Sequence, residues 1–361
     1  MANNIANDRD GETEQAASSG RATMMDVARA AGVSQSSVSL VLNGMTGARI
    51  SDATRHRVIE AAKELGYVLP YKRRQVPQAY GQTIAYLTDE ISTTVFPVQS
   101  IDGARDAAWE AGLLVSTYVT RSNGELEAAT IATIRRNPEL IGVIYATIFT
   151  REITLPAALE GVPVVLLNCY TTPRHTVSVV PGEIVGGYNA TQHLIEHGHR
   201  RIGFINGEPW MDASTDRMTG YRQALGSADI PFEPELVLDG DWLPGSGRAH
   251  LATLMALRSP PTAVFCGNDM IALGAMQMAA ELGLRVPEDL SIIGYDDQVM
   301  AAYTAPPLTT VLLPNYDMGR QAADLLIDMA MHGKQSPPRM FKIDGPVISR
   351  GTVGRPSATS A

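Results

Sequence analysis

Apolar residues recur at spacings of three and four between residues 23 and 67, which is the spacing of one face of a helix. They form three short blocks: Val27, Ala28 and Ala31; then Val38, Val41 and Leu42; then Val58, Ala61, Ala62 and Leu65. A hydroxyl residue able to cap a helix precedes each block, namely Thr23, Ser34 and Ser51. Gly32 and Gly66 stand where a left-handed residue can end a helix. The pattern predicts three short helices around a small core.

The second of these helices has a polar outer face formed by small side chains, Gln35, Ser36, Ser37 and Ser39. Short side chains allow a helix backbone to approach the bases of DNA, and amide and hydroxyl groups can hydrogen-bond to base edges and phosphates. Residues 21–74 contain nine Arg or Lys and four Asp or Glu, a net charge of +5, whereas the whole chain is −9. This asymmetry favours a polyanion partner for this segment. A protein-interaction module with a solvated face is the alternative.

From residue 82 onward, apolar runs typical of buried strands alternate with helical patterns. The strand-like runs are 83–88, 113–119, 141–146, 162–168, 201–206, 262–266 and 291–295. The helical patterns include 101–111, 184–197, 216–225 and 270–282. Such alternation predicts an α/β fold with parallel sheets covered on both faces, and the number of runs suits two doubly wound lobes.

Ligands of such sheets bind beyond the carboxyl ends of strands, so the polar residues that follow the runs are candidates. Asn206, Asn268 and Asp296 follow strand-like runs, and Arg217 is predicted to open a helix. Carboxylates, amides and an arginine can pair with vicinal hydroxyls, while an aromatic ring such as Trp242 can cover a pyranose. Structural roles remain open: Asn268 can cap a helix, Asp296 can end a strand and Trp242 can belong to the core.

The remaining segments bound the class of protein. Residues 1–20 are acidic and polar, which predicts a disordered leader and not a secretory signal. No apolar run reaches about 18 residues, so no membrane span is expected. Cys169 and Cys266 end apolar runs and are expected to be buried free thiols, as in a reducing cytoplasm. Residues 69–81 read as a stiff cationic linker with Lys72, Arg73 and Arg74, either solvated or in contact with DNA.

The first module resembles the DNA-binding headpiece of the LacI/GalR family of bacterial transcriptional regulators, through DVARAAGVS, SSVS, VLNG and RVIEAAKELGY. The resemblance implies that Gln35, Ser36 and Leu40 read bases. It also implies phosphate contacts for Thr23, Ser34, Ser39 and Asn43. Leu40 stands where many members have Arg, which implies an apolar contact to a thymine methyl group. The linker lacks the family's usual hinge pattern, so Lys72–Arg74 are expected to meet phosphates or the minor groove as charges.

The rest of the chain resembles the family's effector-binding domain, through GHRRIGFINGEP, DRMTGYRQAL, PTAVFCGNDMIALGAM, RVPEDLSIIGYDD and PPLTTVLLPNYDMGRQAADLL. That domain is similar to periplasmic sugar-binding proteins, with a cleft between two lobes. The resemblance implies that Arg217, Asn268 and Asp296 hold the effector and that Trp242 and Phe96 stack on it. Pro181-Gly182 replace a polar pair of the first lobe, so we expect fewer hydroxyl contacts on that side.

We therefore predict a helix-turn-helix headpiece at residues 21–68, a linker at 69–81, an effector and dimerisation domain at 82–354 and a disordered tail at 355–361. Within the large domain, the first lobe is expected to comprise 82–182 and 311–332, and the second 184–310 and 341–350.

The predicted function is that of a cytoplasmic homodimeric repressor that binds a near-palindromic operator under control of a small polar effector, a sugar or sugar derivative. No cofactor, metal or membrane partner is expected. A solute-binding protein fits the large domain alone. An enzyme is disfavoured because GxGxxG, GxxxxGK[ST], GxSxG and HExxH are absent from the sequence. His193 and His197 are read as an exposed helix face and not as metal ligands.

Overall fold

The computed structural model describes residues 22–42, 50–67, 81–92, 96–332 and 337–357. The chain divides into two compact units, Met1–Gln75 and Val76–Ala361, and each is described by itself. The leader at 1–20 lies outside the described residues, as does almost all of the linker. So do four predicted DNA contacts: Asn43, Lys72, Arg73 and Arg74.

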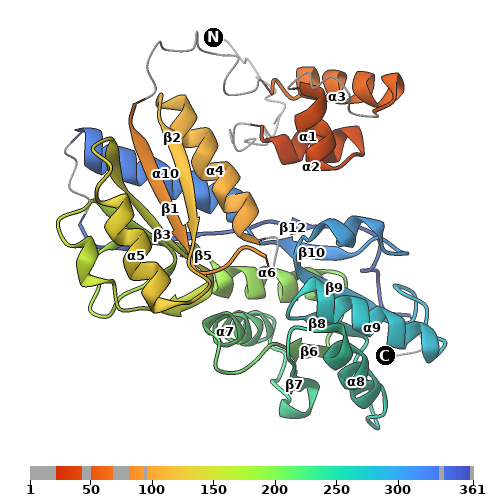
Figure 1. The fold of residues 1–361 in the computed structure, drawn as a ribbon. Coiled ribbons are helices and arrows are strands. Elements are labelled where there is room, and N and C mark those ends of the chain that lie inside the picture. Colours follow the sequence, from red (N-terminus) through yellow and green to blue (C-terminus); the bar gives the residue numbers. More distant parts are fainter. Residues whose placement is uncertain (1–21, 43–49, 68–80, 93–95, 333–336, 358–361) are drawn as a thin grey trace, which may run out of the picture. The chain divides into compact units, whose positions relative to one another are not determined.

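The first unit contains three helices, α1 (Met24–Ala31), α2 (Gln35–Leu42) and α3 (Asp52–Glu64) (Figure 1). Each expected cap is present: Thr23, Ser34 and Ser51 accept hydrogen bonds from the backbone N–H of Asp26, Ser37 and Thr54. One small core joins the helices, with Val27, Val38 and Val58 fully buried at its centre. Leu65, predicted to be buried, is instead 41% exposed because it lies at the end of α3, beyond the last turn that faces the core.

The first lobe of the second unit is a six-stranded sheet in the order β11-β5-β4-β3-β1-β2, with every pair parallel. Its strands are β1 (Thr83–Thr88), β2 (Leu114–Val119), β3 (Leu140–Glu152), β4 (Val164–Tyr170), β5 (Val177–Pro181) and β11 (Met340–Ile343). Helices α4 (Phe96–Glu110) and α10 (Asn315–His332) cover one face, and α5 (Gly124–Ile134) covers the other.

The second lobe is a six-stranded sheet in the order β12-β10-β9-β8-β6-β7, parallel except for the pair β10–β12. Its strands are β6 (Ile202–Asn206), β7 (Val237–Asp239), β8 (Ala263–Cys266), β9 (Ser291–Asp296), β10 (Thr309–Leu312) and β12 (Val347–Ile348). One face packs on α6 (Glu183–Glu196) and α7 (Asp212–Ser227), the other on α8 (Pro244–Met255) and α9 (Asp269–Glu281). The predicted α/β class, with two parallel lobes after a helical module, is confirmed.

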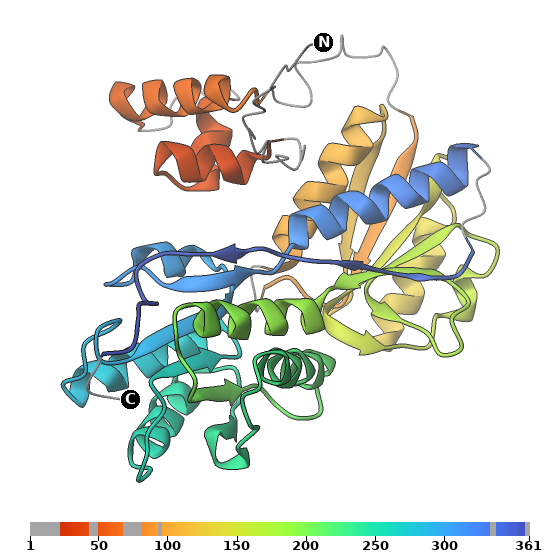
Figure 2. The same cartoon turned by 180° about the vertical axis from the view of Figure 1, so that it is seen from behind.

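The chain passes between the lobes three times: from β5 to α6, from β10 to α10, and from β11 to β12. Figure 2 shows the last passage as the dark blue segment that runs along both lobes. The expected placement of residues 341–350 in the second lobe is wrong for 341–343, because β11 pairs with β5 of the first lobe. Residues 355–357, expected to be part of a disordered tail, are described, and Pro356 lies close to Gly198.

Candidate functional site

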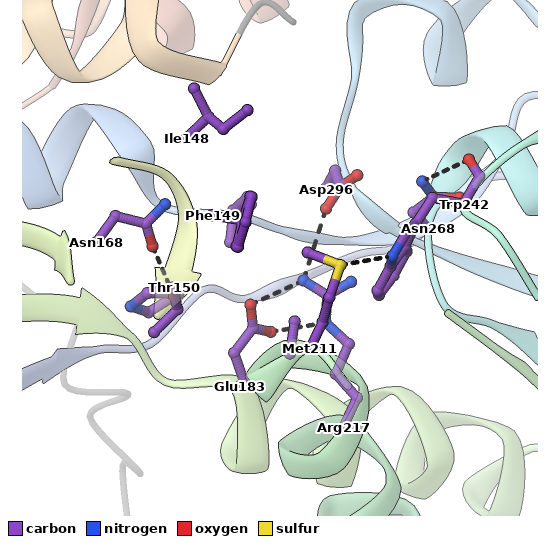
Figure 3. Close-up of a pocket in the computed structure, with 13 residues that line it drawn as sticks. Ile148, Phe149, Thr150, Asn168, Glu183, Met211, Arg217, Trp242, Asn268 and Asp296 are labelled. Carbon is purple, nitrogen blue, oxygen red and sulfur yellow. Dashed lines mark hydrogen bonds and ion pairs between the residues drawn. The ribbon is translucent and has the colours of Figure 1, made fainter. Parts of the chain in front are cut away.

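A cavity of about 290 Å³ lies between the two lobes, at the carboxyl ends of their strands (Figure 3). The first lobe contributes Ile148, Phe149, Thr150, Asn168 and Pro181. The second contributes Glu183, Met211, Ala213, Arg217, Trp242, Asn268 and Asp296, and Leu313 lies on the passage between the lobes. Four of the five predicted effector residues thus line one cavity. The fifth, Phe96, begins α4, and its side chain lies outside the described part of the structure.

Arg217 is the best-connected polar side chain of the cavity, and it is almost completely buried. Its Nε and Nη2 atoms donate to the two carboxylate oxygens of Glu183 at 2.7 and 2.8 Å, while Nη1 donates to the carbonyl of Gly267. The guanidinium carbon also lies 3.6 Å from the centre of the Tyr295 ring. A bidentate pair fixes both the position and the plane of the guanidinium.

Two glycines explain how Arg217 and Glu183 come together from different helices. A Cβ atom on Gly187 of α6 would lie 2.4 Å from the carbonyl oxygen of Arg217, and one on Gly220 of α7 would lie 2.1 Å from that of Ile184. The backbones of the two helices therefore touch, as only glycine permits. Arg217 lies in the second turn of α7, which begins at Asp212 and not at Asp216 as predicted.

Asp296 completes the charged group of the cavity. Its Oδ1 atom lies 3.8 Å from Arg217 Nη2, and its Oδ2 atom accepts from Gln298 Nε2. Burial raises the pKa of Asp296 to about 7, although the charge of Arg217 opposes the shift. Burial and the neighbouring Asp296 likewise raise the pKa of Asp269, which is held by Thr310 and the backbone of Gln298. Asp296 also has a left-handed backbone, with φ of 107°, a strained conformation for a residue with a side chain.

Asn268 and Trp242 have structural roles as well as positions on the cavity wall. Asn268 Oδ1 accepts from the backbone N–H of Ile271 and so caps α9, and its Nδ2 atom donates to the carbonyl of Trp242. Trp242 packs on the core of the second lobe, and its indole N–H points to the sulfur of Met211 at 2.9 Å. Asn268 therefore caps a helix and Trp242 belongs to the core, as considered from the sequence, and both also line the cavity.

Nine of the thirteen cavity residues were not among the predicted effector contacts, and Glu183 and Phe149 are two of them. Glu183 follows β5, a short strand that was not predicted, and begins α6. Phe149 belongs to the end of β3, which continues six residues beyond the predicted run at 141–146. The sequence signal that could have identified them is their position: each is a polar or aromatic residue shortly after an apolar run.

Among the described residues, three side-chain contacts join the lobes beside the cavity, and each involves α7 or the residues just before it. Tyr170 donates from its hydroxyl to Asp212 Oδ2 at 2.8 Å. The rings of Phe149 and Trp210 meet edge to face at 5.6 Å, and Lys342 Nζ lies 3.7 Å from Asp216 Oδ2. The end of α7 that carries Arg217 is therefore tied to the first lobe.

The predicted DNA-contacting residues in the described part of the first unit lie on α1 and α2. Thr23 is the N-cap of α1, and its hydroxyl also donates to Asp26. Ser34 shares hydrogen bonds with the hydroxyls of Ser36 and Ser37. Ser36 is exposed, while Gln35, Ser39 and Leu40 are half-buried, on the helix that buries Val38 and Val41.

Other expectations concern chemistry outside these sites. Cys169 and Cys266 are buried free thiols, as predicted. His193 and His197 lie with ring centres 4.5 Å apart, and the described ranges contain no group of three His, Cys, Asp or Glu side chains that could hold a metal ion. Within the described chain, no helix is both long and apolar enough to cross a bilayer.

Comparison with known proteins relates both units to one family. Residues 23–69 match the model for bacterial regulatory proteins of the lacI family, and residues 191–353 match that for a periplasmic binding protein-like domain. The HTH-type transcriptional repressor PurR of Aliivibrio salmonicida (strain LFI1238) is 31% identical over 336 residues, which cover 92% of this chain and 99% of that protein. The repressor CytR of Escherichia coli (strain K12) is 34% identical, covering 92% and 96%.

Solved structures agree with this relationship. A complex of the transcriptional regulator CelR with cellobiose is 33% identical, with a TM-score of 0.64 and coverage of 92% of this chain and 100% of that one. The lac repressor dimer bound to operator and the anti-inducer ONPF is 26% identical, with a TM-score of 0.64 and coverage of 93% and 100%. These proteins are regulators and not enzymes. The chain belongs to the LacI family of bacterial regulatory proteins and is a DNA-binding transcriptional repressor.

Proposed function

We propose that the protein is a homodimeric repressor whose affinity for a near-palindromic operator is controlled by a neutral sugar bound between its lobes. Two headpieces related by a twofold axis would bind two half-sites. The similarity to a lac repressor dimer supports the dimer, and the first-lobe surface around residues 101–111 is the expected contact. As a repressor of bacterial genes, it would act in the cytoplasm on chromosomal DNA.

Base reading is assigned to Gln35, Ser36 and Leu40, because α2 buries Val38 and Val41 against the core and turns these three residues away from the centre of that stripe. Phosphate contacts are assigned to the hydroxyl and amide residues Thr23, Ser34, Ser39 and Asn43, and to Lys72, Arg73 and Arg74 of the linker. This division separates residues that carry sequence information from residues that only fix the position of the protein on DNA.

The effector is assigned to the cavity between the lobes, with Arg217, Asn268 and Asp296 as polar contacts and Trp242 and Phe96 as stacking surfaces. The single observation that carries this assignment is the charged group of Arg217, Glu183 and Asp296. One guanidinium faces two carboxylates, and the pKa of Asp296 lies near 7, so the group has little net charge near neutral pH. A neutral polyhydroxylated ligand suits such a site better than an anion does. The CelR–cellobiose complex supports a carbohydrate.

Control of DNA binding requires that the effector bind two arrangements of the protein with different affinity. Because the cavity is lined by both lobes, a ligand that fills it favours one relative arrangement of the lobes. The expected coupling between effector and operator binding is about 1–3 kcal/mol, a typical allosteric value.

The DNA assignment is tested with duplexes selected by the full chain from a random pool. Gln35→Ala combined with Ser36→Ala should weaken binding to the selected duplex by at least tenfold, because each lost base contact costs about 1–3 kcal/mol. Binding to random duplex should change little in the same gel-shift or anisotropy assay. An equal loss on both duplexes would show that these residues do not read bases.

The effector assignment is tested by adding neutral sugars and the corresponding sugar acids to the full chain on its selected duplex. A neutral sugar should raise the melting temperature of the protein and change its DNA affinity, whereas the acids should do neither. A response to the acids alone would contradict the proposed class of effector.

A further inference from the structure

A second, much smaller cavity lies inside the first lobe, directly beside the effector cleft. Its volume is about 10 Å³, which is room for a single oxygen atom with its hydrogens. Ile148 and Asn168 line both this recess and the large cavity, so the two are neighbours. The other walls come from β1, β3, β4, α4 and the start of α10: Tyr86, Thr147, Leu167, Pro97, Ser100, Asn315 and Met318.

Asn315 presents an unpaired hydrogen-bond donor in this recess. The residue is 6% exposed, and its Nδ2 atom has no hydrogen-bond acceptor among the described residues. A buried amide without a partner costs free energy, so native structures rarely leave one unpaired. Asn315 lies where the chain passes from β10 to α10, two residues after Leu313, and Leu313 itself lines the effector cavity.

The complementary acceptor is the hydroxyl oxygen of Tyr86, which is hydrogen-bonded to Ser100. The two hydroxyls lie 2.7 Å apart, and that of Ser100 donates its single hydrogen to the carbonyl of Pro97 at 3.0 Å. With that hydrogen directed at Pro97, the hydrogen between the two hydroxyls comes from Tyr86, and the Tyr86 oxygen can still accept. The recess thus contains one donor and one acceptor, the pair that a hydroxyl group satisfies.

We propose that this recess is a single-hydroxyl subsite of the effector cleft, in which Asn315 donates to the hydroxyl and Tyr86 accepts from it. The inference rests on the proposed sugar-binding function. The subsite would give the first lobe a specific polar contact with the effector. Such a contact would make up for the polar pair that Pro181 and Gly182 replace. The volume of the recess admits one hydroxyl and excludes a methoxy or larger substituent, so it selects among sugars at one ring position.

The test measures the affinity of the full chain for the sugar that shifts its melting temperature most, and for the set of its singly deoxygenated analogues. One analogue should bind wild type about tenfold to a hundredfold more weakly than the parent sugar, as expected for a buried donor and acceptor left unpaired. Asn315→Leu should reduce the affinity for the parent sugar by a similar factor. The affinity for that analogue should be nearly the same in this variant as in wild type. Tyr86→Phe, which keeps the buried ring, should give the same non-additive result.

Ser178→Ala is the matched control, since its hydroxyl is also buried in the first lobe without a described partner but lies in neither cavity. It should leave the order of sugar affinities unchanged. Operator binding without sugar shows that each variant is folded.

If Asn315→Leu and Tyr86→Phe each reduce the affinity for every analogue by the same factor as for the parent sugar, the recess holds only water and the subsite is overturned, while the proposed function stands. If no sugar binds wild type, both proposals fail.

Discussion

Arg217 has three kinds of protein contact at once: two hydrogen bonds to Glu183, one to the carbonyl of Gly267, and the face of the Tyr295 ring. These contacts fix the guanidinium in one orientation without a ligand in the cavity. Pre-orientation of this kind reduces the entropy lost when a ligand binds. Because the guanidinium is buried, loss of its carboxylate partner would leave an unpaired charge inside the protein and destabilise the folded state.

Glu183→Gln should lower the free energy of unfolding by about 3–5 kcal/mol, because it removes one partner of a buried ion pair. Urea unfolding of the full chain measures the change. Glu281→Gln is the control, since Glu281 pairs with Arg248 on the surface and should leave the unfolding midpoint unchanged. A similar midpoint for both variants would contradict the structural importance given to the buried pair.

Asp296 should make the protein less stable as pH rises from about 4 to about 7. Its pKa is near 7 in the folded chain, against a reference of 3.8, so between these values the folded state retains a proton that the unfolded state has lost. Stability falls with pH wherever the folded state binds more protons. Asp296→Asn should therefore weaken this decline in urea titrations at pH 5 and pH 7.5. Buried His199 does not contact Asp296 and affects both proteins alike, so it cancels in the comparison. Asp269 does not cancel: removal of the Asp296 charge also lessens the rise in the pKa of Asp269, which weakens the decline further in the same direction.

At the scale of elements, α7 connects the two lobes. It carries Arg217 towards the cavity through its close packing on α6, and its first turn reaches the first lobe through Asp212 and Tyr170. Residues of both lobes line the proposed effector site, so a contact that joins the lobes should favour effector binding without touching the effector.

Tyr170→Phe should weaken effector binding by roughly fivefold, because it removes one hydrogen bond of about 1 kcal/mol between the lobes. Isothermal titration with the responding sugar measures the change. Tyr303→Phe, which alters a tyrosine that is 70% exposed, should have no effect. An unchanged affinity for Tyr170→Phe would mean that this contact does not influence the cavity.

Much of the fold could be predicted at this scale. Helix caps such as Thr23 and Ser51, and long apolar runs such as β1, are encoded by nearby residues. The short strands β5, β7 and β10 were missed because three to five residues give too little periodicity. The placement of β11 depends on pairing with β5, more than 150 residues earlier, which no local pattern reports. Glu183 was missed for the same reason, since its importance comes from Arg217 on another helix.

For the whole molecule, the final strands complete both lobes. β11 is the edge strand beside β5, and β12 pairs with β10. Further along, the backbone of Thr352 accepts from Ile292, its side chain accepts from Thr309, and the carbonyl of Gly354 contacts His199. Residues far from the cavity in sequence therefore stabilise the two sheets that form it.

Two truncations separate these contributions. A chain ending at Arg350 keeps β11 and β12 but lacks Thr352 and Gly354, so faster amide exchange is expected in β9 of the second lobe and not in β3 of the first. A chain ending at Arg339 lacks both strands and should exchange faster in both lobes. Hydrogen exchange followed by mass spectrometry distinguishes the two results, with peptides from α1–α3 as an internal reference that should not change. Equal protection of β3 in the two truncated chains would contradict the assignment of β11.

The position of β11 and β12 also determines when each part can fold during synthesis. The three-helix headpiece is complete once about 70 residues have left the ribosome, whereas neither lobe has all its strands until nearly the last residue has been made. For most of translation, a nascent chain would therefore display a finished DNA-binding module ahead of an unfinished sensor. A premature stop codon in the second half of the gene would therefore release a folded headpiece without complete lobes, and so without the effector control proposed for the full chain.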